Sequence, residues 1–148
     1  MTTPFAQPTL RLTESQYATI VGHCYDGLPD EACGLLVGPM NGNGEPTGRI
    51  SEARPCRNAD ASAVTYTVDP RDMLAAMRAA EARGEEIVGV WHSHTHTDAY
   101  PSPTDVRQAV DPAWLYVLVS LRDDAPVLRS YRVRDETIAE VAVAIDGG

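Results

Sequence analysis

A short apolar run, Ile87-Val-Gly-Val-Trp91, leads directly into His92-Ser-His94. A continuous apolar run of this length is typical of a strand that is buried on both faces of a sheet. Because alternate side chains of an extended segment point the same way, His92 and His94 can face one point while Ser93 faces the other side. The sequence therefore predicts a central strand that carries two imidazoles to one end of a sheet.

Three helices are predicted around this strand. Thr13 and Gln16 have the spacing of a capping box, and apolar residues then recur at helical spacing up to Gly27. Asp69 and Pro70 begin a second helix that ends at Gly84, and its inward face is predicted to contain Met73, Leu74, Met77 and Ala80. A third helix is predicted to start with Ser102 as its cap, followed by Pro103 and Asp105.

The other apolar runs predict strands. A strand is expected at residues 31–38, beginning at or just before Glu31, and others at 48–55, 64–68, 114–121, 127–133 and 137–145. Together with the helices they predict an α/β or α+β fold with a mixed sheet. With 148 residues, of which 43% are hydrophobic, we expect one domain over residues 1–148, with its core at about 10–146.

Composition excludes several functions. All twelve basic residues are arginine, which removes reactions that need a P-loop, Schiff-base or acylation-centre lysine. A net charge of −9 argues against nucleic acid as a partner. No apolar run approaches the roughly 20 residues that span a bilayer, and the first residues lack a signal-peptide pattern, so we expect a cytoplasmic protein with no membrane partner. Cys24, Cys33 and Cys56 form no C-x-x-C pair, and buried thiols are expected.

His92, His94 and Asp105 are the predicted metal ligands. Two nitrogens and one carboxylate oxygen suit Zn²⁺ and leave a fourth position for water, as in catalytic zinc sites. Glu31 is the candidate acid/base that moves the proton of this water, and Ser102 the candidate donor to an oxyanion. Taken singly, each residue has a plainer explanation, since Ser102 and Asp105 fit a helix cap, His92 a strand-end histidine and Glu31 a solvated carboxylate.

The spacing of these residues resembles that of a known family. His92-Ser-His94, seven residues, Ser102, two residues and Asp105 reproduce the H-x-H-x(7)-S-x-x-D pattern of the JAMM, or MPN-plus, metalloproteases. Residues 29–38 resemble the segment that supplies the glutamate of that family, and the small bacterial Mec-type CysO-cysteine peptidases are the most similar branch. The resemblance implies a cytidine-deaminase-like fold, one zinc ion held by His92, His94 and Asp105, an acid/base role for Glu31 and oxyanion stabilisation by Ser102.

The resemblance also implies a substrate. The Mec-type enzymes release cysteine from the C-terminal Gly-Gly of a ubiquitin-like sulfur carrier, so such a carrier is the expected partner. Two alternatives stay open: trimming of a carrier tail so that Gly-Gly becomes available for thiocarboxylate formation, and a non-catalytic MPN scaffold that binds proteins. His96 lies on the same alternating face as His92 and His94, so a His94–His96 metal pair is conceivable. Because that pair would leave only five residues before Ser102, we assign His96 to the cleft rim.

Overall fold

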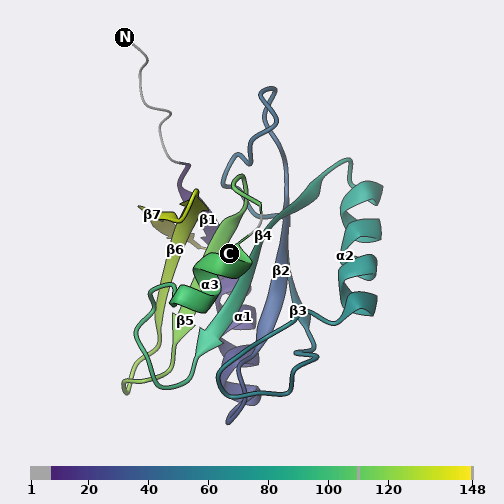
Figure 1. The fold of residues 1–148 in the computed structure, drawn as a ribbon. Helices are drawn as coiled ribbons and strands as arrows, with labels where there is room; N and C mark the ends of the chain where they lie inside the picture. The colour runs from purple at the N-terminus through teal and green to yellow at the C-terminus, as the bar shows by residue number, and fades with distance from the viewer. Residues whose placement is uncertain (1–7, 110, 148) are drawn as a thin grey trace.

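The computed structural model describes residues 8–109 and 111–147, and its main feature is a six-stranded mixed sheet (Figure 1). The strand order is β3-β2-β4-β5-β6-β7, and neighbours are antiparallel except for the parallel pair β4 and β5. The bounds are β2 Cys33–Gly38, β3 Glu52–Cys56, β4 Glu86–His94, β5 Leu115–Ser120, β6 Val127–Arg134 and β7 Thr137–Val141. The predicted mixed-sheet fold is confirmed.

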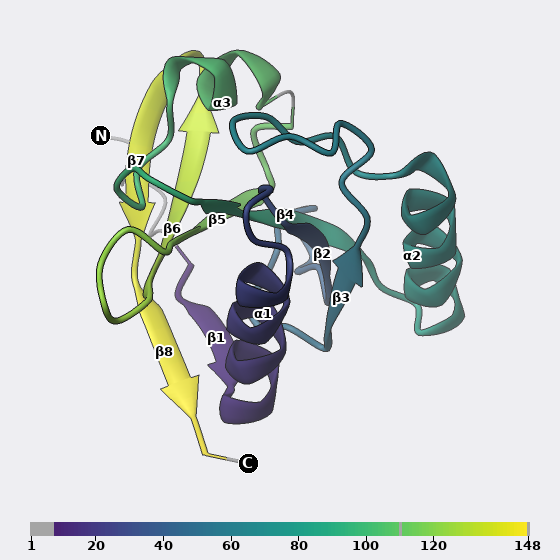
Figure 2. The ribbon, with the colours of Figure 1, turned by 90° about the horizontal axis from the view of Figure 1, so that it is seen from below.

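Three helices flank the sheet, as expected: α1 Glu14–Asp26, α2 Pro70–Ala82 and α3 Pro103–Gln108. The predicted capping box of α1 forms between Thr13 and Gln16, and Asp69 caps α2. The two longer helices lie on opposite sides of the sheet (Figure 2) and pack in separate cores. On one side are Ile20 and Cys24 of α1 with Leu36, Trp91 and Val117, and on the other Ala76 of α2 with Cys33, Leu35 and Val90.

The predicted inward face of α2 is partly wrong. Leu74 and Met77 are 48% and 54% exposed, whereas Ala76 and Ala80 are buried and Met73 packs against the core. Alanine has the smallest apolar side chain, so this face allows the helix to approach the sheet closely. The periodicity predicted the helix correctly, but the predicted buried face contained the large apolar side chains, whereas the alanines are the residues that are buried.

Several strand predictions also need correction. Residues 64–68 form no strand; only Val68 makes an isolated bridge, to Asn58. The run predicted at 31–38 begins its strand at Cys33, so Glu31 precedes β2, and the run at 48–55 contributes Glu52–Cys56. The last run is divided at Ala142 into β7 and β8 (Val143–Asp146), and β8 pairs in parallel with β1 (Leu10–Thr13), which the sequence did not predict.

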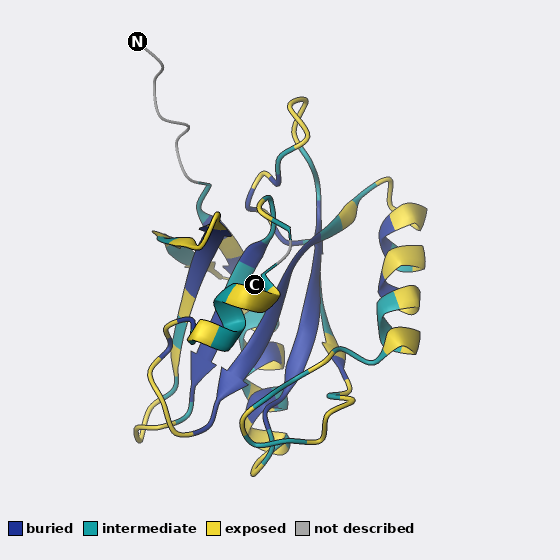
Figure 3. Ribbon diagram, viewed as in Figure 1, coloured by how far each residue is buried: buried dark blue, intermediate teal, exposed yellow. Residues whose placement is uncertain are grey.

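Burial is greatest at the centre of the sheet, where β4 lies between β2 and β5 (Figure 3). From Val88 to His94 every residue of β4 is buried, as expected for a strand covered on both faces. No described helix is long and apolar enough to cross a bilayer. The first seven residues, to which the signal-peptide argument applied, lie outside the described residues. The end of the strand that carries both histidines is therefore enclosed by the rest of the fold.

Gly34 provides a test of this packing. A Cβ atom at Gly34 would overlap the indole ring of the fully buried Trp91 and come within 2.6 Å of the Arg54 carbonyl oxygen. We expect Gly34→Ala to lower the free energy of unfolding by about 2 kcal/mol, because the tightly packed core resists an added methyl group. Urea denaturation measures this loss.

Gly22→Ala is the matched control, because a Cβ atom there meets nothing within 4 Å. Gly22 lies inside α1, so its replacement by alanine should raise the free energy of unfolding by up to about 1 kcal/mol. Equal effects of the two substitutions would contradict the close approach of β2 to Trp91.

Candidate metal centre

Strand β4 delivers His92 and His94 to one end of the sheet. Both imidazoles lie on the same face as Val90, two residues earlier, and they are 4% and 5% exposed. Ser93 points to the opposite face, where its Oγ accepts a hydrogen bond of 2.9 Å from the Ala32 N–H. The predicted alternation of side chains thus holds up to the last residue of the strand.

The first turn of α3 adds the carboxylate of Asp105. Its Oδ1 lies 3.3 Å from Nε2 of His92, and its Oδ2 lies 2.9 Å from Nε2 of His94. Ser102 holds Asp105 in place through a capping box: the Ser102 N–H donates to Oδ2 at 2.9 Å, and the Asp105 N–H donates to the Ser102 Oγ at 3.1 Å. One potential ligand atom from each of His92, His94 and Asp105 lies within 4.8 Å of the others.

This group fits a metal ion. Nε2 of His92 is buried and has no hydrogen-bond partner within the part of the chain that the structure describes, so it is an unsatisfied polar atom directed at the group. Nδ1 of His94 donates to the Asp98 carbonyl at 2.7 Å, so Nε2 is the ring nitrogen that faces Asp105 and the site. Two imidazole nitrogens and a carboxylate oxygen that converge in a buried place are the donors of a mononuclear site with an open position.

The charges within the group support one another. Burial alone would raise the pKa of Asp105, but its contacts with His92 and His94 and with the Ser102 N–H hold that pKa well below its usual range. Burial lowers the pKa of His92, which favours the neutral imidazole that binds metals. The pKa of His94 is raised above its usual value. Burial lowers this pKa, but the hydrogen bonds to Asp105 and to the Asp98 carbonyl raise it by more.

Glu31 lies at the entrance of β2, next to this group and outside it. The residue is 7% exposed. Burial is the main cause that raises the pKa of Glu31 to about 7. The charge of His94 lowers this pKa, and the negative charge of Asp105 raises it further. A carboxyl group with a pKa near neutrality can both accept and release a proton under ordinary conditions.

His96 takes no part in the group. It is exposed and lies in the bend beyond β4, so it no longer follows the alternation of the strand. Hydroxyl groups of the neighbouring strands β5 and β6 hold the turn that contains it. Ser120 donates to the Thr97 carbonyl and Tyr131 donates to the Ala99 carbonyl, both at 2.5 Å. These two hydroxyls fix the turn whose Asp98 carbonyl orients His94.

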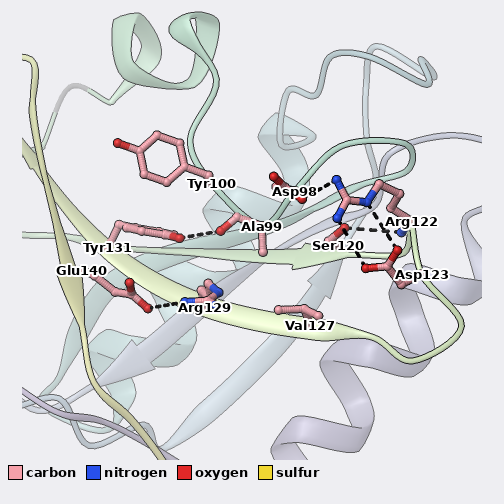
Figure 4. A pocket seen from close by; sticks show the side chains of 10 residues that line it. All are labelled: Asp98, Ala99, Tyr100, Ser120, Arg122, Asp123, Val127, Arg129, Tyr131 and Glu140. Carbon is pink, nitrogen blue, oxygen red and sulfur yellow. Dashed lines mark hydrogen bonds and ion pairs between the residues drawn. The ribbon is translucent and has the colours of Figure 1, made fainter.

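A hollow of about 450 Å³ is lined in part by Asp98 and Ala99 of this turn (Figure 4). Its charged side chains contact each other, with Arg122 directed at Asp98 and Asp123, and Arg129 at Glu140. None of the five predicted site residues lines it. The hollow is therefore separate from the metal group, although Asp98 and Ser120, which line it, belong to the contacts that hold the turn next to His94.

Two contacts of the site were not predicted from the sequence. The Asp98 carbonyl that orients His94 is a backbone group, which has no signature in the sequence. Tyr66 stacks on His92, with ring centroids 4.2 Å apart and planes 22° apart, although 26 positions separate the two residues in the sequence. Only a family pattern or a structure could have connected them.

The fold and the donor group together place the chain among α/β domains with a group that could hold a metal ion at the end of a sheet. Within that class, the chain belongs to the prokaryotic homologs of the JAB domain, whose family model matches residues 13–134. The resemblance seen in the sequence is thereby confirmed.

Individual relatives agree with this assignment. The chain is 43% identical over 127 residues to a CysO-cysteine peptidase of Mycobacterium tuberculosis, covering 85% of this chain and 84% of that one. It is 31% identical over 116 residues to a desampylase of Haloferax volcanii, covering 75% and 80%. A solution structure of a Desulfitobacterium hafniense protein superposes with a TM-score of 0.82 at 32% identity, over 93% of each chain.

The raised pKa of Glu31 leads to a stability prediction for protein freed of metal by a chelator. The ordinary pKa is 4.5 and the folded value is about 7, so the native state binds the proton more tightly than the unfolded chain does. Native stability from this group is therefore lost as the pH rises from about 4.5 to 7. We expect Glu31→Gln to be more stable than wild type at pH 8, by on the order of 1–3 kcal/mol, and the difference to shrink towards pH 4.

Urea denaturation at several pH values measures this difference. Glu81→Gln, at an exposed position of α2, serves as the control and should follow wild type at each pH. If the Glu31→Gln variant showed no gain at pH 8, the idea that burial strains the Glu31 carboxylate would be wrong.

Proposed function

We propose that this protein is a zinc metallopeptidase that cleaves the bond after the C-terminal Gly-Gly of a ubiquitin-like sulfur carrier and releases cysteine. The observation that carries the proposal is the group of buried His92 and His94 with half-buried Asp105, together with the buried carboxyl of Glu31 beside it. The similarity to a CysO-cysteine peptidase over 85% of the chain supports this substrate class. A cytoplasmic location stays a prediction from the sequence.

Zinc is the metal that suits these donors best. Zn²⁺ accepts imidazole and carboxylate ligands in a tetrahedral arrangement, and catalytic zinc sites keep three protein ligands. Bound at this group, zinc would act as a Lewis acid and lower the pKa of a water molecule to about 7. The low exposure of His92 and His94 keeps bulk water away from their nitrogens and strengthens electrostatic interactions there.

Glu31 and Ser102 have complementary roles in the proposed reaction. Glu31 takes a proton from the attacking water and returns it to the leaving amine, and a pKa of about 7 suits both transfers. The Ser102 Oγ accepts from the Asp105 N–H, so its own hydrogen is available for a developing oxyanion on the substrate carbonyl. Ser102 can thus cap α3 and donate to the oxyanion at the same time, so its role as a helix cap does not exclude a role in the reaction.

Metal binding can be tested without any substrate. We expect one zinc ion per chain, measured by elemental analysis and by competition with a chromophoric chelator. His92→Ala and Asp105→Asn should each weaken binding by more than the roughly 10–100-fold that the loss of an outer partner costs. His96→Ala should bind like wild type, and equal loss in that variant would overturn the choice of ligands.

The reaction is tested with a sulfur carrier that ends in Gly-Gly-Cys, followed by intact mass. Wild-type protein with zinc should remove one cysteine, and Glu31→Gln should be slower by about 10²–10⁴, because proton transfer by a positioned side chain contributes that much. Zinc binding without cleavage would exclude cysteine release. Carriers with longer tails after Gly-Gly then distinguish tail trimming, and a failure on all of them supports a scaffold.

A further inference from the structure

The segment of residues 58–68, here called the 58–68 loop, lies against both parts of the site. An isolated bridge between Asn58 and Val68 joins its ends, so the loop is closed at its base. It follows β3 and precedes α2, and none of the five predicted site residues belongs to it. Its contacts reach Glu31 and His92, and Thr95 also donates to the Ala63 carbonyl at 3.3 Å.

The loop holds the backbone of Glu31 from both sides. The Glu31 N–H donates to the Ser62 carbonyl at 2.8 Å, and the Glu31 carbonyl accepts from Nδ2 of Asn58 at 3.0 Å. Glu31 precedes β2, which begins at Cys33, so the regular pairing of the sheet does not extend to it. These two bonds therefore act directly on the backbone of Glu31, in addition to the pairing of its neighbour Ala32 with Ser93.

Asn58 also determines the shape of the loop. Its Nδ2 donates a second hydrogen bond to the Thr65 carbonyl, and its Oδ1 accepts from the N–H groups of Asp60 and Thr67, all at 3.0 Å. An asparagine amide offers two donors and two acceptor lone pairs, and here all four are used. One side chain thus couples the conformation of the loop to the position of Glu31.

Tyr66 fixes the other part of the site. The two histidines are held differently: His94 is oriented by the hydrogen bond from its Nδ1 to the Asp98 carbonyl, whereas His92 is stacked on the ring of Tyr66. Nε2 of His92 has no hydrogen-bond partner among the described residues and lies 3.3 Å from Oδ1 of Asp105. The stacked ring of Tyr66 restrains the plane of His92, a task that an outer hydrogen bond often performs for a metal-binding histidine.

We propose that the 58–68 loop positions both parts of the site, with Asn58 as the positioning residue for Glu31 and Tyr66 as the positioning residue for His92. The proposal rests on the proposed function for its kinetic consequence only. It assigns separate effects to the two residues: Asn58 governs the turnover number at constant zinc affinity, and Tyr66 governs zinc affinity.

The first arm of the test compares Asn58→Asp with Ser62→Ala. Aspartate keeps the two acceptor bonds within the loop and loses both Nδ2 donors, the one to the Glu31 carbonyl and the one to the Thr65 carbonyl. Ser62→Ala removes a side chain that accepts from the N–H groups of Val64 and Thr65, and it keeps the Ser62 carbonyl. We expect Asn58→Asp to lower kcat about 10–100-fold, with KM and zinc affinity within about threefold of wild type, because a small misplacement of a reacting group costs this much. Ser62→Ala should keep its kcat.

The second arm compares Tyr66→Leu with Tyr66→Phe and needs no substrate. Loss of the stacked ring in Tyr66→Leu should weaken zinc binding about 10-fold or more, and phenylalanine should restore it. Thermal unfolding of each chelator-treated variant confirms that it is folded. This arm can succeed even if no carrier is ever cleaved, so it separates a failure of the positioning proposal from a failure of the proposed function.

Either of two results would overturn the proposal: an unchanged kcat in Asn58→Asp, or equal zinc affinity in Tyr66→Leu and wild type. An equal loss of kcat in Ser62→Ala would also contradict it, because the effect would then belong to loop order in general and not to the amide that holds Glu31.

Discussion

The antiparallel pairing of β2 with β4 is the constraint on which the site depends. The pairing continues one residue beyond β2, at Ala32. There the Ser93 N–H donates to the Ala32 carbonyl at 3.0 Å and the Ser93 Oγ accepts from the Ala32 N–H at 2.9 Å, which joins residues 61 positions apart. Ala32 follows Glu31, and Ser93 separates His92 from His94. Because both bonds are buried, a shift of either strand would leave polar groups unpaired, so Glu31 and the two histidines keep a fixed relation.

The site places polar and ionisable groups where the fold would otherwise bury apolar ones. His92, His94 and Glu31 are all less than a tenth exposed, at the end of a strand whose preceding residues form the core. Contacts around the two histidines compensate for part of this burial: Asp105 faces both of them, and the helix cap at Ser102 holds Asp105. Such local conflict between burial and polarity is common where a protein has a function, because the same arrangement that strains the apo fold prepares it for a ligand.

Local patterns in the sequence predicted much of this arrangement, and long-range contacts account for the rest. The caps at Thr13, Asp69 and Ser102 and the buried strand before His92 were predicted correctly because the signals lie within a few residues. Strand β1 was missed because its partner β8 lies at the other end of the chain. Residues 64–68 resemble a strand in composition, but Asn58 binds the backbone at Thr65 and Thr67, and the segment becomes a loop.

The pairing of β1 with β8 gives the molecule a mechanical property. The two strands are parallel, with Leu10 opposite Val143 and Thr13 opposite Asp146, so the chain enters at one end of this small sheet and leaves at the other. A force that pulls on the two ends of the chain would load all the hydrogen bonds of this pair in shear at the same time. The large sheet that carries the metal group lies between these strands in the sequence and would feel tension only after the pair had separated.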